Sequence, residues 1–162
     1  MPLVAVTASD YESAATAFSG KGAADNGGRW NSRGVPMVYS STSLALAAIE
    51  LFVHLEPIQA PGDLDFISAT LPEGEPARTI HPGDLPPDWF TGDELAGPHS
   101  TRELGDRWIR DSSSLALMVP SVSIRPEWNV LINPLHPRIR DLKIDAPQPF
   151  VFDARMFEQK AK

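Results

Sequence analysis

A single carboxylate in an apolar stretch is the feature of this sequence that most needs a chemical explanation. Between Arg33 and Glu56 the only formally charged side chain is Glu50, and its neighbours are mostly leucine, alanine, isoleucine and valine. A carboxylate is costly to bury unless it is paired, protonated or exposed to a cleft. Two interpretations follow: an ion pair with an arginine such as Arg29 that only holds the fold together, or a catalytic carboxylate that faces a pocket.

Further polar residues stand near predicted strand ends, where functional sites are often built. Arg29 follows a glycine pair, and its guanidinium suits phosphate oxygens because it offers paired donors and keeps its charge. On pattern alone Tyr39 is more typical of a core aromatic, and Ser121 and Asn133 of turns beside proline. A serine hydrolase built on Ser121 and His136 is a weak alternative, since the sequence holds no G-x-S-x-G motif.

The segment from 42 to 55 carries Glu50, and apolar residues all round its helical wheel predict a buried helix. Further helices are expected over 11–18 and 101–110, the second with Ser100 as its N-cap. Apolar runs predict strands at 3–6, up to Tyr39, and at 64–71, 115–119, 129–132 and 150–152. Strands mixed with a few helices predict an α+β fold, with a small mixed β-sheet core and flanking helices.

Two irregular segments lie between these elements. Four glycines within 19–28 predict an exposed or ligand-approaching loop. The region from 72 to 98 is rich in proline and acidic residues and predicts turns packed against the body, not a linker between domains. The charged tail 158–162 is expected to fray. With 162 residues the chain has room for one substantial core, so a single domain over 1–162 is predicted.

The charge balance restricts the kinds of partner. Lysine and arginine number 14 against 21 acidic residues, which gives a net charge of −7 without any basic run. Sequence-independent binding to nucleic acid needs a basic face, so direct nucleic acid binding is not expected. A small anionic molecule remains a suitable ligand, because a few well-placed arginines are enough to bind it.

No metal site and no membrane segment are expected from the sequence. The chain has no cysteine, and its four histidines are far apart, without helical metal-ligand spacing. The first residues lack a basic region followed by a long apolar stretch, and no run of about 20 apolar residues occurs. The expected compartment is the cytoplasm.

A family resemblance is carried by several motifs in a fixed order. The run GGRWNSRGVPMVYSS, followed by LALAAIE, LALMVPS, WNVLINPLHP and FVFDAR, resembles the RES domain family, which is named for its arginine, glutamate and serine. The motifs span essentially the whole chain. Matched residue by residue, the resemblance implies that Arg29, Glu50 and Ser121 are those three residues. It implies that Tyr39 and Asn133 also line the pocket.

Proteins of this family are toxins of toxin–antitoxin pairs, with a fold similar to ADP-ribosyltransferases. The resemblance therefore implies that the chain breaks down NAD by hydrolysis or phosphorolysis and arrests growth. NAD would be the substrate, phosphate a conceivable co-substrate, and no resident cofactor or metal would be needed. The implied partner is a helical Xre-type antitoxin that covers the active site, and the family also suggests a homodimer.

The implied chemistry gives each residue a role. Cleaving the bond between nicotinamide and ribose leaves an oxocarbenium-like centre, which a nearby carboxylate stabilises; the resemblance thus favours the catalytic interpretation of Glu50. Arg29 would anchor the diphosphate, Tyr39 would position the nicotinamide end, and Ser121 and Asn133 would complete the polar wall. Two alternatives stay open: transfer of ADP-ribose to a protein acceptor, and a non-catalytic domain that only binds its antitoxin.

Overall fold

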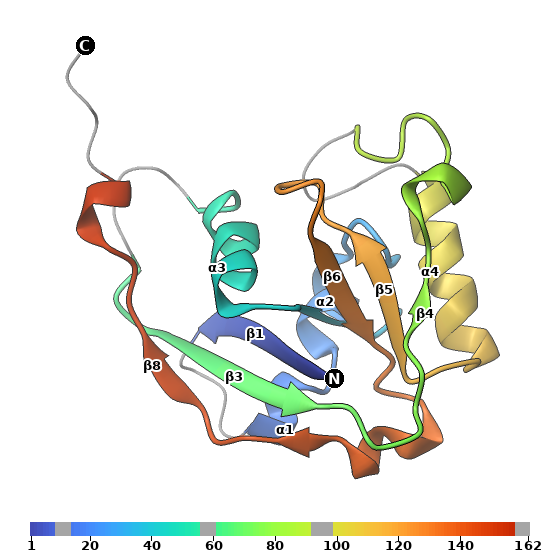
Figure 1. The fold of residues 1–162 in the computed structure, drawn as a ribbon, viewed down its shortest axis with the longest axis horizontal. Helices are drawn as coiled ribbons and strands as arrows, with labels where there is room; N and C mark the ends of the chain where they lie inside the picture. Colours follow the sequence, from blue (N-terminus) through green and yellow to red (C-terminus); the bar gives the residue numbers. More distant parts are fainter. Residues whose placement is uncertain (9–13, 56–60, 92–98, 158–162) are drawn as a thin grey trace.

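The computed structural model describes residues 1–8, 14–55, 61–91 and 99–157. Eight strands form one mixed sheet in the order β4-β5-β6-β2-β1-β3-β7, with β8 paired to β3 (Figure 1). The strands are β1 (Pro2–Ala8), β2 (Val38–Ser41), β3 (Leu64–Thr70), β4 (Arg78–Thr79), β5 (Ala116–Pro120), β6 (Trp128–Ile132), β7 (Lys143–Ile144) and β8 (Gln148–Phe150). Every pairing is antiparallel except β4 with β5. The predicted α+β class is confirmed.

The helices within the described ranges are α1 (Ala14–Ala17), α2 (Lys21–Asn26), α3 (Leu44–Phe52) and α4 (His99–Asp111). Three short 3-10 turns complete the list: η1 (Pro82–Asp84), η2 (Pro137–Asp141) and η3 (Ala154–Met156). None of the helices in these ranges is long and apolar enough to cross a membrane.

Alternation along the central strands creates a core on each face of the sheet. Val130 and Ile132 of β6 join one cluster, while Leu131 between them joins the other. Successive side chains of a strand point to opposite faces, so a strand covered on both sides is apolar throughout. Trp108 and Ile109 of α4 pack in the cluster with Leu131, which places α4 against that face (Figure 1).

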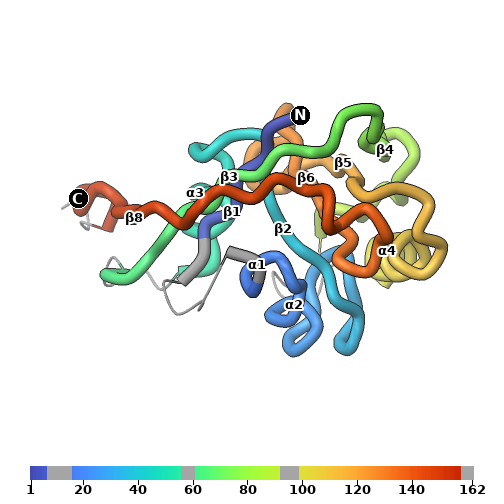
Figure 2. The backbone as a smooth tube through the Cα atoms, turned by 90° about the horizontal axis from the view of Figure 1, so that it is seen from below, coloured from blue at the N-terminus to red at the C-terminus, as the bar shows by residue number. Residues whose placement is uncertain are grey.

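The segment between α1 and β2 projects from one side of the sheet, in blue to cyan in Figure 2. Glycine allows it to approach α4 closely: a Cβ on Gly105 would lie 1.8 Å from the carbonyl oxygen of Trp30. The backbone N–H of Ser32 also donates to Asp106 Oδ1 at 2.9 Å. Helix α4 therefore fixes the loop that carries Arg29.

Several local predictions need correction. The glycine-rich stretch 19–28 contains the short helix α2, because Gly20 adopts a left-handed conformation at its start and Gly27 ends it. Part of the 72–98 region forms β4, since backbone pairing with β5 outweighs its proline content. Ser100 lies inside α4 and is not its N-cap, because the helix already includes His99. The last strand ends at Phe150, and the tail prediction lies outside the described residues.

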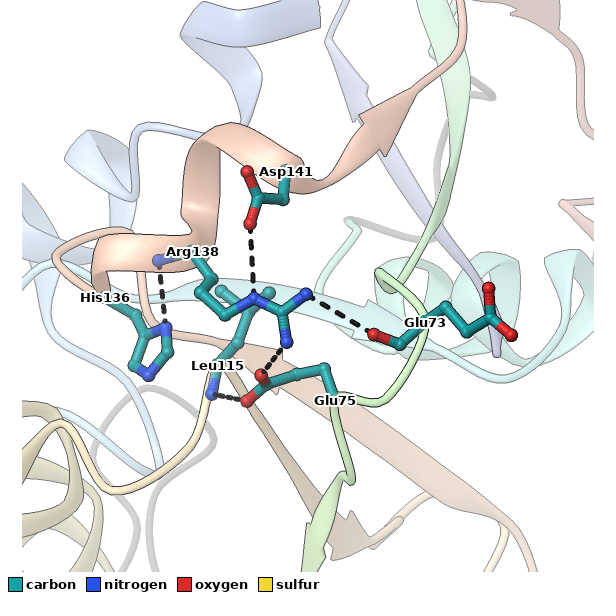
Figure 3. Close-up of polar contacts among 6 residues, drawn as sticks. All are labelled: Glu73, Glu75, Leu115, His136, Arg138 and Asp141. Carbon is teal, nitrogen blue, oxygen red and sulfur yellow. Dashed lines mark hydrogen bonds and ion pairs between the residues drawn. The ribbon is translucent and has the colours of Figure 1, made fainter.

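A group of polar contacts ties the β4 region to the rest of the sheet (Figure 3). Glu75 accepts from the backbone N–H of Leu115 at 3.1 Å and from Arg138 Nη1 at 2.7 Å. Arg138 also donates from Nε to Asp141 at 3.2 Å. Glu75 thus connects three segments that are distant in sequence.

Candidate active site

Helix α3 presents one face to the sheet and another to a cavity. It begins at an extended Ser43, whose side chain accepts from the backbone N–H of Leu46, a typical N-cap. Leu46, Ala47 and Ala48 are buried, and α3 packs on β1 and β2. The expectation that this helix is buried all round is wrong: Val53 is 42% exposed, because that side of the helix end borders the cavity.

The cavity has a volume of about 490 Å³, within the range of small-molecule sites. Four titratable or charged side chains line it, namely Arg29, Tyr39, Glu50 and His54. Its other walls come from β1, β2, α3, the 27–30 loop and the ends of β5 and β6. The apolar side chains along it include Val4, Val6, Trp30, Leu51, Val53 and Val122.

Glu50 is held in this wall by neutral donors. Its Oε1 accepts from Ser121 Oγ and Asn129 Nδ2, each at 2.6 Å, and its Oε2 accepts from Ser123 Oγ at 2.9 Å. Within the described part of the chain the three hydrogen-bond partners of this carboxylate carry no charge, so the arrangement fits a pocket-facing carboxylate better than a structural ion pair.

Arg29 reaches the same cavity from the 27–30 loop. Its Nη1 donates to the backbone carbonyls of Trp89 at 3.0 Å and Thr91 at 3.2 Å, while its own carbonyl accepts from Thr101 Oγ1 at 2.8 Å. Both the backbone and the guanidinium of Arg29 are therefore held in place. A fixed guanidinium at a cavity wall is suited to binding an anionic group.

The hydroxyl of Tyr39 is enclosed, although 37% of the residue's surface is exposed. It accepts from the backbone N–H of Trp30 at 3.0 Å and donates to Asn31 Oδ1 at 2.8 Å. Burial raises the pKa of the Tyr39 phenol well above its usual range, against the opposing effects of the Trp30 hydrogen bond and the Arg29 charge. Tyr39 also lines the cavity, and because its hydroxyl is bonded to the loop, its aromatic ring is the part available to a ligand. Gly28 is required here, because a Cβ would lie 2.6 Å from the Tyr39 oxygen.

The two remaining predicted site residues lie differently. Ser121 is fully buried beside Glu50 and also accepts from the backbone N–H of Ile124 at 2.9 Å, so it contacts the carboxylate and does not line the cavity. Asn133 is not brought to the site. Its amide donates to the carbonyl of Ile109 at 3.2 Å, and its oxygen accepts from Leu135 N–H at 2.9 Å. In place of the expected pocket position, Asn133 satisfies buried backbone groups after β6.

Sequence reasoning missed Asn129, Ser123 and His54. Asn129 and Ser123 bind the Glu50 carboxylate, and all three line the cavity. The polar position of Asn129 within an otherwise apolar strand was an available signal. His54 stands four residues after Glu50, in the turn that follows α3. Among the described residues no cluster of three metal-ligating side chains occurs.

Comparison with known proteins places this chain in a family. The family model for the RES domain matches residues 2–153. The chain belongs to the RES domain family. The resemblance carried by the sequence motifs is therefore confirmed.

Members of the RES domain family with curated names resemble this chain over most of their length. A protein from Sphingobium sp. (strain YBL2), named "Prs ADP-ribosylating toxin", is 36% identical over 158 residues, covering 96% of this chain and 95% of that protein. "Toxin Res" from Pseudomonas putida (strain KT2440) is 37% identical over 145 residues, covering 86% of this chain and 92% of that protein. "Toxin Res" from Yersinia enterocolitica is 32% identical, covering 88% and 91%.

The RES fold of this chain also resembles a solved structure. The match is to the crystal structure of the M. tuberculosis MbcT–MbcA toxin–antitoxin complex, with a TM-score of 0.69 and 15% sequence identity. It covers 96% of this chain and 86% of that chain. At this identity the likeness shows a shared fold.

Proposed function

We propose that this RES domain protein is the toxin of a toxin–antitoxin pair and cleaves the nicotinamide–ribose bond of NAD. One observation carries the proposal: the Glu50 carboxylate lines a cavity of about 490 Å³ and is oriented by three neutral donors. A cavity of this size accommodates a ligand of the nucleotide class. The toxin names of the curated relatives support the toxin role in this proposal.

In the proposed step, the bond between ribose C1′ and the nicotinamide nitrogen breaks, and nicotinamide leaves as a neutral molecule with the bonding electron pair. The ribose is left with oxocarbenium character, as in glycoside cleavage. The Glu50 carboxylate stabilises this positive charge, because a fixed carboxylate in a partly enclosed site interacts more strongly with a nearby positive charge than a carboxylate in water does. An incoming nucleophile then bonds to C1′ and releases its proton to solvent.

Arg29 and Tyr39 hold the substrate in this proposal. Arg29 binds the diphosphate with a guanidinium that backbone carbonyls already orient. Tyr39 presents its ring to the nicotinamide end, since its hydroxyl is engaged with Trp30 and Asn31. Ser121 acts on Glu50 and not on NAD, because it contacts the carboxylate and does not line the cavity.

The acceptor distinguishes three outcomes of the same cleavage. Water gives hydrolysis, phosphate gives phosphorolysis, and a protein side chain gives ADP-ribosylation. The last is a second candidate function, because the Sphingobium relative is named an ADP-ribosylating toxin. All three use the same cavity and the same carboxylate.

An antitoxin partner is part of the proposal. The solved structure with the shared fold is that of a toxin–antitoxin complex, which supports a partner of this kind for the present chain. The family resemblance points to the Xre type and to a toxin homodimer. Such an antitoxin would inhibit by covering the cavity that holds Glu50.

The first experiment incubates purified, antitoxin-free protein with NAD, in buffer with and without phosphate, and identifies the products by mass. Nicotinamide with ADP-ribose indicates hydrolysis, and a phosphate-dependent product phosphorylated on the ribose indicates phosphorolysis. Intact NAD in both buffers, with radiolabel from NAD appearing on protein in a cell lysate, would establish ADP-ribosylation. Intact NAD without labelled protein would contradict catalysis and leave a binding role.

Glu50→Gln tests the residue assignment. The substitution keeps the shape but removes the charge, so kcat should fall by about 100-fold or more. Glu103→Gln is the matched control, because Glu103 lies on the exposed side of α4 and should leave kcat unchanged. Circular dichroism and unfolding midpoints verify that both variants fold. Wild-type turnover in folded Glu50→Gln would contradict the assignment.

A further inference from the structure

The side chains of Ser41 and Asn129 form a cross-strand pair below Glu50. Strands β2 and β6 are antiparallel, and their register sets Ser41 directly opposite Asn129. Directly opposite residues project from the same face of the sheet. Tyr39, two residues before Ser41, lines the cavity from that face as well. The register of one strand pair thus places a hydroxyl, an amide and an aromatic ring under the candidate site.

The hydrogen bonds of this pair run in one direction. Ser41 Oγ donates to Asn129 Oδ1 at 2.7 Å, and Asn129 Nδ2 donates to Glu50 Oε1 at 2.6 Å. An ionised carboxylate only accepts, so the amide nitrogen must face Glu50 and the amide oxygen must face Ser41. The Ser41 hydroxyl donates to the amide oxygen and so holds the amide in the orientation that the carboxylate requires. Ser41 is buried, at 2% exposure, which protects this bond from water.

The two oxygens of Glu50 consequently differ. Oε1 accepts two hydrogen bonds, from Ser121 and Asn129, while Oε2 accepts one, from Ser123. A carboxylate oxygen has room for about two such bonds, so Oε1 is saturated and Oε2 keeps a site for a further partner. Oε2 is thus the oxygen able to meet a ribose hydroxyl or a developing cation.

We propose that Ser41 is a positioning residue that acts through Asn129, fixing the Glu50 carboxylate so that Oε2 faces the bound substrate. This inference rests on the proposed function for its kinetic readout, and it has a second readout that does not. Ser41 is part of the cavity wall, and its hydroxyl donates to the Asn129 amide. Its removal should therefore lower the rate of the chemical step and leave substrate binding intact.

The kinetic test compares Ser41→Ala with Thr42→Val. Thr42 is the neighbouring hydroxyl, and it donates to the backbone carbonyl of Trp128 at 3.3 Å without reaching Glu50. Ser41→Ala should lower kcat for NAD cleavage about tenfold with KM within about twofold, the loss expected when a hydrogen bond to a charged group weakens. Thr42→Val should keep the wild-type kcat. Equal kcat values in wild type and Ser41→Ala would overturn the inference.

A double-mutant cycle separates positioning from a general structural role. If Ser41 acts only through Asn129, Ser41→Ala should change kcat by less than about twofold when Asn129 is already alanine. An undiminished tenfold loss in the Asn129→Ala background would overturn the inference, because Ser41 would then act by another route.

The second readout is the side-chain amide signal of Asn129 in 15N NMR, assigned by its disappearance in Asn129→Ala. Bound between Ser41 and Glu50, the amide protons should exchange slowly with water, and exchange should accelerate in both Ser41→Ala and Glu50→Gln. This result needs no NAD turnover, so an inactive wild-type protein would contradict the proposed function while the amide contact is still measured. Unchanged amide exchange in Ser41→Ala would overturn the inference.

Discussion

The Tyr39 hydroxyl connects strand β2 to the loop that carries Arg29. It bonds to the backbone of Trp30 and to the side chain of Asn31. Asn31 in turn donates its amide to the carbonyls of Ala23 and Val35, at 2.8 and 2.9 Å. One phenol therefore stabilises the whole turn beside the candidate site, and its protonation state affects the stability of the fold.

The raised pKa of Tyr39 predicts a specific loss of stability at alkaline pH. Below about pH 10 both folded and unfolded chains keep the phenol proton, so the Tyr39 contribution is present in full. Above that pH only the unfolded chain releases the proton, and the free energy of unfolding falls, by at most about 1.4 kcal/mol per pH unit from this group. Tyr39→Phe lacks this dependence.

Urea unfolding of wild type and Tyr39→Phe at pH 8, 9.5 and 10.5 measures the effect. At pH 8 the variant should be less stable by about 1–3 kcal/mol, because the Trp30 N–H loses its acceptor. The difference should shrink as pH rises through 10. A difference that stays constant from pH 8 to 10.5 would show that the phenol titrates alike in both states.

At the scale of elements, the contacts of Glu75 hold the β4 region against the sheet (Figure 3). Strand β4 has only two residues, Arg78 and Thr79, so backbone pairing alone gives it little stability. Glu75 lies just before it and accepts from Leu115, the residue before β5, and from Arg138 of η2. A largely buried carboxylate thus replaces the ladder bonds that a longer strand would provide.

Two substitutions separate the parts of this contact. Glu75→Ala leaves the fully buried backbone N–H of Leu115 without its acceptor, so the free energy of unfolding should fall by about 1–3 kcal/mol. Arg138→Met removes the ion pair but keeps the bond to Leu115, and its effect should be smaller. Chemical unfolding of both variants provides the comparison. A larger loss for Arg138→Met would show that the ion pair, not the backbone bond, dominates.

At the scale of the whole molecule, the end of the chain supports the helix that carries Glu50. Phe52 of α3 lies 5.9 Å from Phe152 and 5.3 Å from Phe157, measured between ring centroids. Phe150 of β8 is 4.9 Å from Phe152. Because β8 pairs with β3, these rings link the edge of the sheet to the far end of α3. Residues about a hundred positions apart in sequence therefore set the position of Glu50.

Phe152→Ala should reduce stability and activity together. Phe152 is 5% exposed, so its truncation should cost about 3–5 kcal/mol, and the loosened end of α3 should lower kcat for NAD cleavage. The neighbouring Val151 is 76% exposed, and Val151→Ala should change stability by less than about 0.5 kcal/mol. Thermal unfolding and NAD turnover measure both quantities. Full kcat in a destabilised Phe152→Ala would show that the aromatic cluster does not position Glu50.

The sequence by itself determined the elements with strong local patterns. Strands β3, β5 and β6 lie within one residue of the predicted ranges. Short apolar runs that end near a proline are typical of buried strands, so their positions can be predicted from local sequence. Glu50 could also be singled out from the sequence, because a lone carboxylate in an apolar helix contrasts with its neighbours. The motifs around Arg29, Glu50 and Ser121 were enough to indicate the RES family, which the family model confirms.

The tertiary structure decided which side chains meet. Asn129 of β6 reaches Glu50, and Ser41 of β2 reaches Asn129, because of strand register, which depends on the pairing of whole strands and not on local propensity. The same pairing places Asn133 beyond the end of β6, where it binds backbone groups instead of the cavity. Helix α3 looked buried because its composition is apolar all round. In the folded protein α3 packs against the sheet with one side only, and the other side of the helix borders the cavity that is the candidate active site.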